Sequence, residues 1–195
     1  MLTLYYSPGS SSMATHIALN ETGAPFELKL IELYRHDNRN AAYLRVNPEG
    51  KVPTLVADGG APLTEVAATL WYLARRYPDA GLLPQHGDID GEARVISWMS
   101  FIASTIHPAR RAGDERWREV FRLADARLGN RDWAVGRYSI ADIHLFRLYW
   151  RFVDTLHPPA SDYPKLSAHY DRMMARPAVK KTIAAESAVG YHLPR

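Results

Sequence analysis

The sequence predicts an α/β domain over residues 1–79 and an all-helical domain over residues 88–195, joined by a linker at 80–87. Three observations predict this division. Short β-prone runs alternate with turn residues before position 64, a Pro- and Gly-containing stretch follows at 78–87, and apolar residues beyond it keep helical spacing. Since 47% of the 195 residues are hydrophobic, either part can bury a core of its own.

The first part opens with a pattern of strand, helix and strand. Leu2-Thr3-Leu4-Tyr5-Tyr6 is a short β-prone run, and Ser7-Pro8-Gly9-Ser10 breaks it before a helical pattern that contains Met13 and Ile17. Residues 26–33 are strand-like again. The opening is therefore expected to be a βαβ unit whose two strands are parallel.

Two further strands and a helix complete the first part. Residues 52–57 and 61–63 are short strand patterns linked by Asp58-Gly59-Gly60, which is typical of a hairpin turn. Thr64 can then cap a helix whose apolar residues share one face. The expected topology is βαβ followed by ββα.

The second part is predicted to be helical throughout. Five helices are expected: over 88–107, over 115–128, from Ser139, from Ser161 or Asp162, and after Arg176-Pro177. Pro108 ends or bends the first of them. Ser139 as the cap and Asp142 three residues later form a variant of the capping box, with Asp in place of Glu or Gln.

The composition limits the chemistry of the protein. A formal net charge of +3, with 23% charged residues, is weak evidence for a nucleic-acid or membrane partner, and none is expected. Without cysteine, the chain can form no disulfide, no Cys-type zinc site and no mixed disulfide with a substrate thiol. The eight histidines lack metal-ligand spacing, so no metal is expected. With neither a leader pattern nor an apolar run of roughly 20 residues, a cytoplasmic protein is expected.

Three separated segments resemble the glutathione S-transferase family. They are Tyr6 with Ser10-Ser11-Ser12, then Asn47-Pro48-Glu49-Gly50-Lys51-Val52-Pro53-Thr54-Leu55, and finally Leu63-Thr64-Glu65. Residues 133–142 resemble the family's helical-domain signature, so the likeness covers nearly the whole chain. With His16 and His107, it is most similar to the bacterial beta class. The resemblance implies a thioredoxin-like first domain, glutathione as co-substrate and a homodimer.

The resemblance also implies where glutathione lies. It places the ligand against Ser12, Lys51, Val52, Pro53, Glu65 and Val66. A cis Val52-Pro53 bond would turn the Val52 backbone toward the cysteinyl N–H and C=O groups of the ligand, whereas a trans proline at the start of an edge strand is the alternative. Free N–H groups at a helix N-terminus suit the γ-glutamyl carboxylate, and Glu65 suits the ammonium. Many family members have Ser where this chain has Val66, so weaker glutathione binding is expected.

Catalysis requires a group that favours the glutathione thiolate, because an unperturbed thiol has a pKa of about 8.5. By register with Tyr6, Ser11 stands where the beta class usually has Cys, and its hydroxyl can donate a hydrogen bond to the thiolate. Ser10 and Ser12 are close rivals, and helix capping is the alternative role for all three. Tyr6 could donate its phenol instead, or pack into the core.

Residues of the helical domain complete the expected site. His107 could orient or polarise the thiol, or it could simply be a histidine favoured by a helix C-terminus. The pocket for a hydrophobic electrophile is expected to include Met13, Phe101, Ser104 and Ile106. The segment between His107 and Trp133 is shorter than is usual in the family, which suggests a more open pocket.

The predicted function is glutathione transfer to small hydrophobic electrophiles. Thiol-disulfide reductase chemistry is disfavoured because the chain has no thiol of its own. One alternative is a non-catalytic binding or interaction module, which Val66, the missing cysteine and the short segment favour. Another is a glutathione-dependent isomerase or lyase, which would use the same thiolate.

Overall fold

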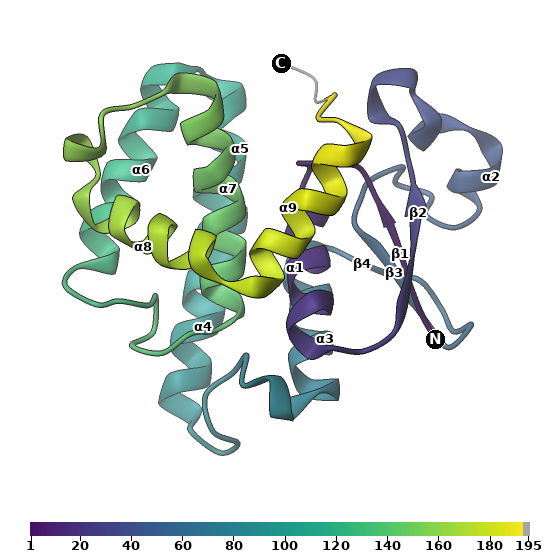
Figure 1. The fold of residues 1–195 in the computed structure, drawn as a ribbon, viewed down its shortest axis with the longest axis horizontal. Helices are drawn as coiled ribbons and strands as arrows, with labels where there is room; N and C mark the ends of the chain where they lie inside the picture. Colours follow the sequence, from purple (N-terminus) through teal and green to yellow (C-terminus); the bar gives the residue numbers. More distant parts are fainter. Residues whose placement is uncertain (193–195) are drawn as a thin grey trace. The chain divides into compact units, whose positions relative to one another are not determined.

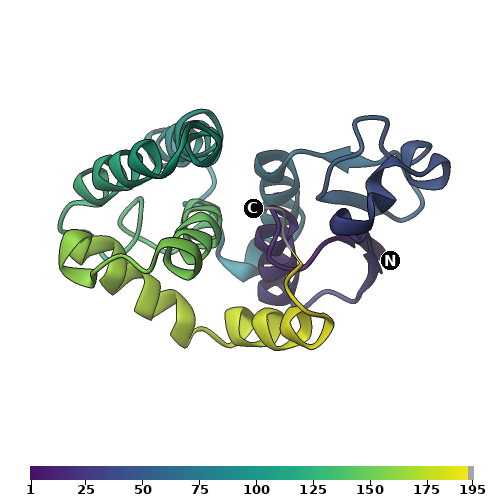
Figure 2. The ribbon, with the colours of Figure 1, turned by 90° about the horizontal axis from the view of Figure 1, so that it is seen from above.

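The computed structural model describes residues 1–192 and contains two compact units. Met1–Ala80 form the first unit together with the helix that begins at Pro177, and Gly81–Arg176 form the second. The sequence assigns this last helix to the helical domain over 88–195. In the structure, α9 (Pro177–Val189) instead packs on α1 (Ser12–Thr22) in the first unit, as Figures 1 and 2 both show.

A four-stranded sheet is the centre of the first unit, with the order β2-β1-β3-β4. Its strands are β1 (Leu2–Tyr6), β2 (Phe26–Leu30), β3 (Thr54–Ala57) and β4 (Leu63–Thr64). β1 and β2 are parallel, while β3 runs antiparallel to both β1 and β4 (Figure 1). The predicted βαβ–ββα topology is confirmed, although β3 begins at Thr54 rather than at residue 52.

Helices α1 and α3 (Val66–Arg76) pack against each other in this unit. The Thr15 and Thr69 hydroxyls join them at 2.8 Å. Residues 12–19 of α1 are all buried, because β1, α3 and α9 all pack against this helix. Because this helix has no exposed stripe, its sequence has only a weak amphipathic pattern. The sequence therefore predicts the helix itself better than the elements that pack against it.

The connection from β2 to β3 contains short helical turns that the sequence did not predict. They are η1 (Leu33–Arg35), η2 (Asp37–Arg39) and α2 (Ala41–Leu44). These turns are too short to show an apolar period, and local capping stabilises them. The Asn40 side chain, for example, accepts a hydrogen bond of 2.8 Å from the Tyr43 N–H. A further turn, η3 (Pro78–Ala80), ends the first stretch of this unit.

The second unit is helical, and its helices are shown from a second direction in Figure 2. Its elements are α4 (Ile89–Phe101), the π-helical segment η4 (Ile102–Ile106), α5 (His107–Ala109), η5 (Arg110–Ala112), α6 (Asp114–Leu128), α7 (Ile140–Leu156), η6 (Ala160–Asp162) and α8 (Pro164–Ala175). The helix predicted over 88–107 therefore continues past Pro108 through a widened turn. A proline lacks the N–H of a regular helix and clashes with the carbonyl four residues earlier, and π-helical geometry accommodates both.

A buried carboxylate organises the start of α7. Ser139 and Asp142 form the predicted capping box. The fully buried Asp142 carboxylate also accepts hydrogen bonds from the Ala134 N–H at 2.7 Å and from His169 Nε2 at 3.0 Å. Residues 81–87 of the expected linker belong to this unit too, and the Ile140 N–H donates to the Leu82 carbonyl at 2.9 Å.

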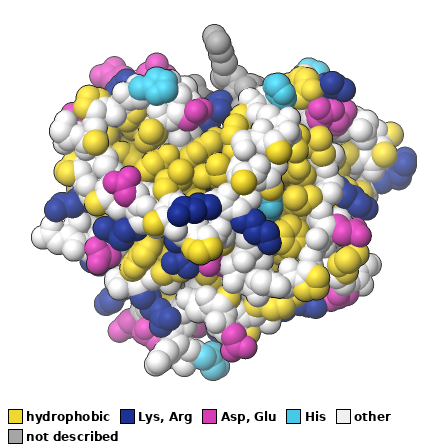
Figure 3. Space-filling view, in the orientation of Figure 1, with side chains coloured by type: hydrophobic (Ala, Val, Ile, Leu, Met, Phe, Trp, Pro, Cys, Tyr) yellow, Lys and Arg dark blue, Asp and Glu magenta, His cyan; other side chains and the backbone are white. Residues whose placement is uncertain are grey.

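The surface carries both signs of charge. On the face shown in Figure 3, basic and acidic side chains are interspersed, in agreement with a formal net charge of only +3. Within residues 1–192, no helix combines the length and the apolar character that a membrane crossing requires.

Candidate functional site

The register of the sheet brings three loops to one end of the first unit. Tyr5 pairs with Thr54, and Thr54 pairs in turn with Thr64. The end of β1, the start of β3 and the end of β4 therefore lie side by side. The loop over residues 7–11, the Val52-Pro53 pair and Glu65 extend directly from these strand ends.

Two serines of the first loop use their hydroxyl protons inside the protein. Ser12 Oγ donates to the Ser7 carbonyl at 3.1 Å and accepts from the Ser7 N–H at 3.1 Å. Ser10 Oγ lies 2.8 Å from Ser12 Oγ and accepts from the Ser12 N–H at 3.2 Å. Because each hydroxyl has one proton and that of Ser12 goes to Ser7, Ser10 must be the donor to Ser12. Both side chains are buried.

Ser11 differs from its neighbours. It is partly exposed, it occupies the N-cap position of α1, and its side chain makes no capping hydrogen bond. In the part of the chain that the structure describes, its hydroxyl has no hydrogen-bond partner. Among the three serines, Ser11 is thus the one with a hydroxyl proton available to a ligand.

The Val52 backbone is unpaired, and the peptide bond between Val52 and Pro53 is cis, as predicted. Within residues 1–192, neither the N–H nor the C=O of Val52 has a hydrogen-bond partner. The preceding Lys51 carbonyl, by contrast, accepts from the Tyr43 hydroxyl at 2.5 Å and from Asn47 Nδ2 at 2.8 Å. The loop is therefore fixed just before a residue whose backbone can pair with an extended peptide.

The turn that leads into this segment requires glycine. Gly50 has a φ of +62°, and a Cβ at this position would lie 2.6 Å from the Asn38 carbonyl oxygen. The Lys51 ammonium points to solvent and pairs with Glu49 at 2.7 Å. To contact a ligand at this end of the sheet, the Lys51 ammonium would have to leave this exposed ion pair. Breaking such a pair costs little free energy.

Glu65 occupies the N-cap position of α3, where the sequence had placed Thr64. Thr64 instead ends β4, and Glu65 takes the unusual backbone conformation of φ 67° and ψ 130°. Such a conformation in a residue other than glycine is costly, and it commonly marks a ligand site. The Glu65 side chain is exposed and has no hydrogen-bond or ion-pair partner among the described residues.

The N-terminus of α3 adds free donors next to this carboxylate. The intrahelical ladder begins with the Thr69 N–H, which donates to the Glu65 carbonyl at 3.0 Å. The N–H groups of Val66, Ala67 and Ala68 therefore have no acceptor within the helix. A carboxylate, which suits a helix N-terminus, and an ammonium, which suits Glu65, could both be held here.

Glu186 of α9 is the residue that sequence reasoning missed. It is fully buried, and its Oε2 accepts a hydrogen bond of 2.6 Å from the Gly9 N–H in the serine loop. Its Oε1 accepts from His16 Nδ1 at 2.9 Å. No local pattern could have found these contacts, because 177 and 170 sequence positions separate the partners.

Tyr6 is a buried residue at the end of β1. Burial raises the pKa of its phenol, and the negative charge of Glu186 raises it further. Its ring packs edge-on against His16, with ring centroids 5.9 Å apart. This packing agrees with the alternative in which Tyr6 belongs to the core.

The remaining predicted residues are not brought together within the first unit. Met13 is fully buried in α1 and exposes no surface to a substrate. Phe101, Ser104 and His107 belong to the second unit, where Ser104 and His107 are exposed and lie in or beside the π-helical segment. Their roles in substrate binding or catalysis stay predictions.

Comparisons with known proteins identify the family of this chain. The family model for the N-terminal domain of glutathione S-transferases matches residues 10–76, and that for the C-terminal domain matches residues 97–177. Glutathione S-transferase GstA of Escherichia coli O157:H7 is 32% identical over 201 residues, which cover 95% of this chain and 98% of that protein.

Solved structures give the same result. The structure of a sphingomonad glutathione S-transferase complexed with glutathione has a TM-score of 0.84 and 35% identity, covering 95% of this chain and 98% of that one. A beta-class glutathione S-transferase of Sphingomonas chungbukensis has a TM-score of 0.83 and 35% identity, covering 94% and 98%.

The Glu186 contacts lead to a prediction about stability. The Glu186→Ala variant should lose about 3–5 kcal/mol of unfolding free energy, because it leaves the buried Gly9 N–H and His16 without their acceptor. Urea denaturation measures this loss. Lys181→Gln, at an exposed position on the same helix, is the control and should stay within about 0.5 kcal/mol of the wild type. A Glu186→Ala variant as stable as this control would contradict the anchoring role.

Proposed function

This chain belongs to the glutathione S-transferase family, and we propose that it conjugates glutathione to small hydrophobic electrophiles. One observation carries the proposal. The unpaired Val52 backbone, the unpaired Glu65 carboxylate and the free Ser11 hydroxyl all adjoin the same end of one sheet. These three groups match the peptide backbone, the ammonium and the thiol of glutathione in turn.

The spacing of the strands suits an extended tripeptide. β1 and β4 are two strand positions apart, with β3 between them, which corresponds to about 10 Å. Three residues of extended chain span at most about 10 Å. A ligand whose cysteinyl backbone pairs with Val52 could therefore direct its γ-glutamyl end to Glu65 and its thiol toward the loop after β1.

Ser11 is the proposed thiol-activating residue. A hydrogen bond to a charged group contributes about 1.5–3 kcal/mol, which corresponds to a decrease of about one to two units in the thiol pKa. Since Ser10 and Ser12 already use their protons within the loop, they would have to break these contacts to serve the thiolate. Conjugation then needs only a bound thiolate held near an electrophile.

A non-catalytic binding module is the second candidate function. The first residue of α3 is Val66, which offers its backbone N–H but no hydroxyl to the γ-glutamyl carboxylate. Weaker glutathione binding would follow from this loss. An isomerase or lyase that uses the same glutathione thiolate would share every feature of the site.

We also propose that the protein is a homodimer, as the family resemblance implies. Exposed apolar side chains on α4 and α6 support this proposal, namely Ile89, Ile96 and Leu123 with 78%, 48% and 49% of their surface exposed. Size-exclusion chromatography with light scattering should report a mass of two chains. A monomer at micromolar concentration would count against the dimer.

Two matched serine variants test the proposed function. Ser11→Ala should lower the rate of conjugation to a model electrophile such as 1-chloro-2,4-dinitrobenzene by about tenfold or more, since it removes a charge-assisted hydrogen bond. The neighbouring Ser10→Ala is the control and should keep a larger share of the activity.

Retention on immobilised glutathione distinguishes the two candidate functions. A protein that is retained but shows no turnover would support the binding module. Equal activity in both serine variants would indicate that Tyr6 or backbone N–H groups contact the thiol instead. Failure to bind glutathione at all would refute the proposal.

A further inference from the structure

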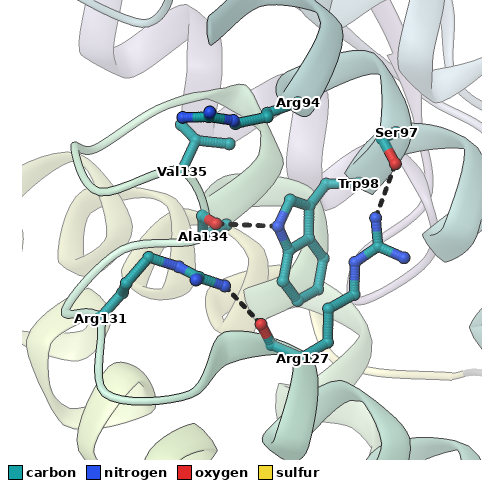
Figure 4. Close-up of a pocket in the computed structure, with 7 residues that line it drawn as sticks. All are labelled: Arg94, Ser97, Trp98, Arg127, Arg131, Ala134 and Val135. Atoms are coloured by element: carbon teal, nitrogen blue, oxygen red, sulfur yellow. Dashed lines mark hydrogen bonds between the residues drawn. The ribbon is translucent and has the colours of Figure 1, made fainter. Parts of the chain in front are cut away.

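The helical unit contains a pocket that the proposed function does not use. Its volume is about 260 Å³, and its lining consists of Arg94, Ser97, Trp98, Arg127, Arg131, Ala134 and Val135 (Figure 4). The residues come from α4, from the end of α6 and from the loop that precedes α7. All of them belong to the second unit, so the pocket is complete within it.

Three arginines and no acidic residue line this pocket. In the part of the chain that the structure describes, no carboxylate lies within 4.0 Å of any of the three guanidinium groups. The Arg94 guanidinium has no hydrogen-bond partner among these residues. Three guanidinium groups around one hollow, with no carboxylate beside them among the described residues, constitute a local excess of positive charge.

The floor of the pocket is held rigidly. Trp98 is buried, and its indole N–H donates to the Ala134 carbonyl at 2.8 Å. The Arg127 guanidinium lies over the Trp98 ring, 4.7 Å from its centroid, and donates to Ser97 Oγ at 2.7 Å. Figure 4 shows these contacts, together with the bond from Arg131 to the Arg127 carbonyl. Because a charged group is already fixed in place, a ligand would bind without ordering it first.

Among the described residues, no carboxylate pairs with the Arg127 guanidinium. Burial lowers the pKa of this guanidinium, and the neighbouring Arg131 lowers it further. Arginine nevertheless stays charged in proteins. An anion in the pocket would therefore relieve the repulsion between these two groups as well as form its own hydrogen bonds.

We propose that this pocket binds a small organic anion with at least two negative charges, either a phosphate ester or a polycarboxylate. Each guanidinium has five N–H donors arranged for planar, bidentate binding of such groups, and the contacts within the protein leave most of them free. The exposed Arg94 and Arg131 give access from solvent. Val135 and the side of Trp98 offer a small apolar surface for the rest of the ligand.

The size of the pocket limits the ligand. A volume of about 260 Å³ is just below the range of about 300–1,000 Å³ that is usual for drug-sized ligands. The anion is therefore a compact metabolite-like molecule rather than a nucleic acid or a large conjugate. The proposal is independent of glutathione binding, because none of the residues belongs to the first unit.

Isothermal titration calorimetry with two probes tests the proposal and separates the two sources of charge. Phenyl phosphate represents phosphate esters, and propane-1,2,3-tricarboxylate represents polycarboxylates. At least one of them should bind wild-type protein with a Kd of about 1 mM or tighter at low salt. The Arg94→Ala/Arg131→Ala double variant should weaken that binding by about tenfold or more, because it removes two charged donors.

A second double variant controls for net charge. Arg111→Ala/Arg122→Ala removes the same charge at two exposed positions of the helical unit that do not line the pocket, and binding should change less than about threefold. Circular dichroism confirms that both variants fold.

Three results would overturn the proposal. One is no binding of either probe, and another is an equal loss of affinity in the two double variants. The third is dissociation of a dimer by Arg94→Ala/Arg131→Ala without any anion binding to the wild type. In that case the arginines would contact acidic side chains of a second copy of the chain.

Discussion

The buried carboxylate of Glu186 joins the last helix of the chain to the loop after the first strand. It accepts one hydrogen bond from the Gly9 backbone and one from His16, and it is fully buried. An unpaired carboxylate would be very costly in this environment, so the loop, α1 and α9 have to form together. Ser11 lies between Gly9 and α1 in the chain, so the hydrogen bonds of Glu186 to Gly9 and His16 also fix its position.

The strand pairing in the sheet then determines which groups lie beside the loop after β1. Pairing of Tyr5 with Thr54 and of Thr54 with Thr64 brings the strand ends to one edge. At that edge, neither the Val52 backbone nor the Glu65 carboxylate has a partner within residues 1–192, and Glu65 is held at a positive φ. Backbone strain and unpaired polar groups both reduce stability, so their accumulation at one edge is typical of a binding site.

Local patterns predicted most of the fold. The strand runs, the turn at 58–60 and the capping box of Ser139 and Asp142 are encoded within a few residues of each other, which is why sequence reasoning found them. The position of α9 could not be found in this way, because its contacts with α1 span more than 150 residues. Widening of the helix before Pro108 was missed for a different reason, since proline more often ends a helix than alters its geometry.

The candidate site was predicted in part. Family resemblance led to Val52, Pro53, Glu65 and the serine loop, and the cis bond is present. The resemblance could not identify which of the three consecutive serines is available to the thiol. That choice depends on which hydroxyl protons are already used, and only the contacts of Ser10 and Ser12 with each other and with Ser7 reveal it. The arginine pocket was missed because its three arginines lie up to 37 positions apart and carry no motif.

The central claim is that this site stabilises the glutathione thiolate through Ser11. The most direct test is a pH titration of the ultraviolet absorbance of bound glutathione, in the wild type and in Ser11→Ala. The account predicts a thiol pKa about one to two units below the free value of about 8.5 in the wild type, and a return toward that value in the variant. A wild-type complex whose thiol titrates like free glutathione would contradict it.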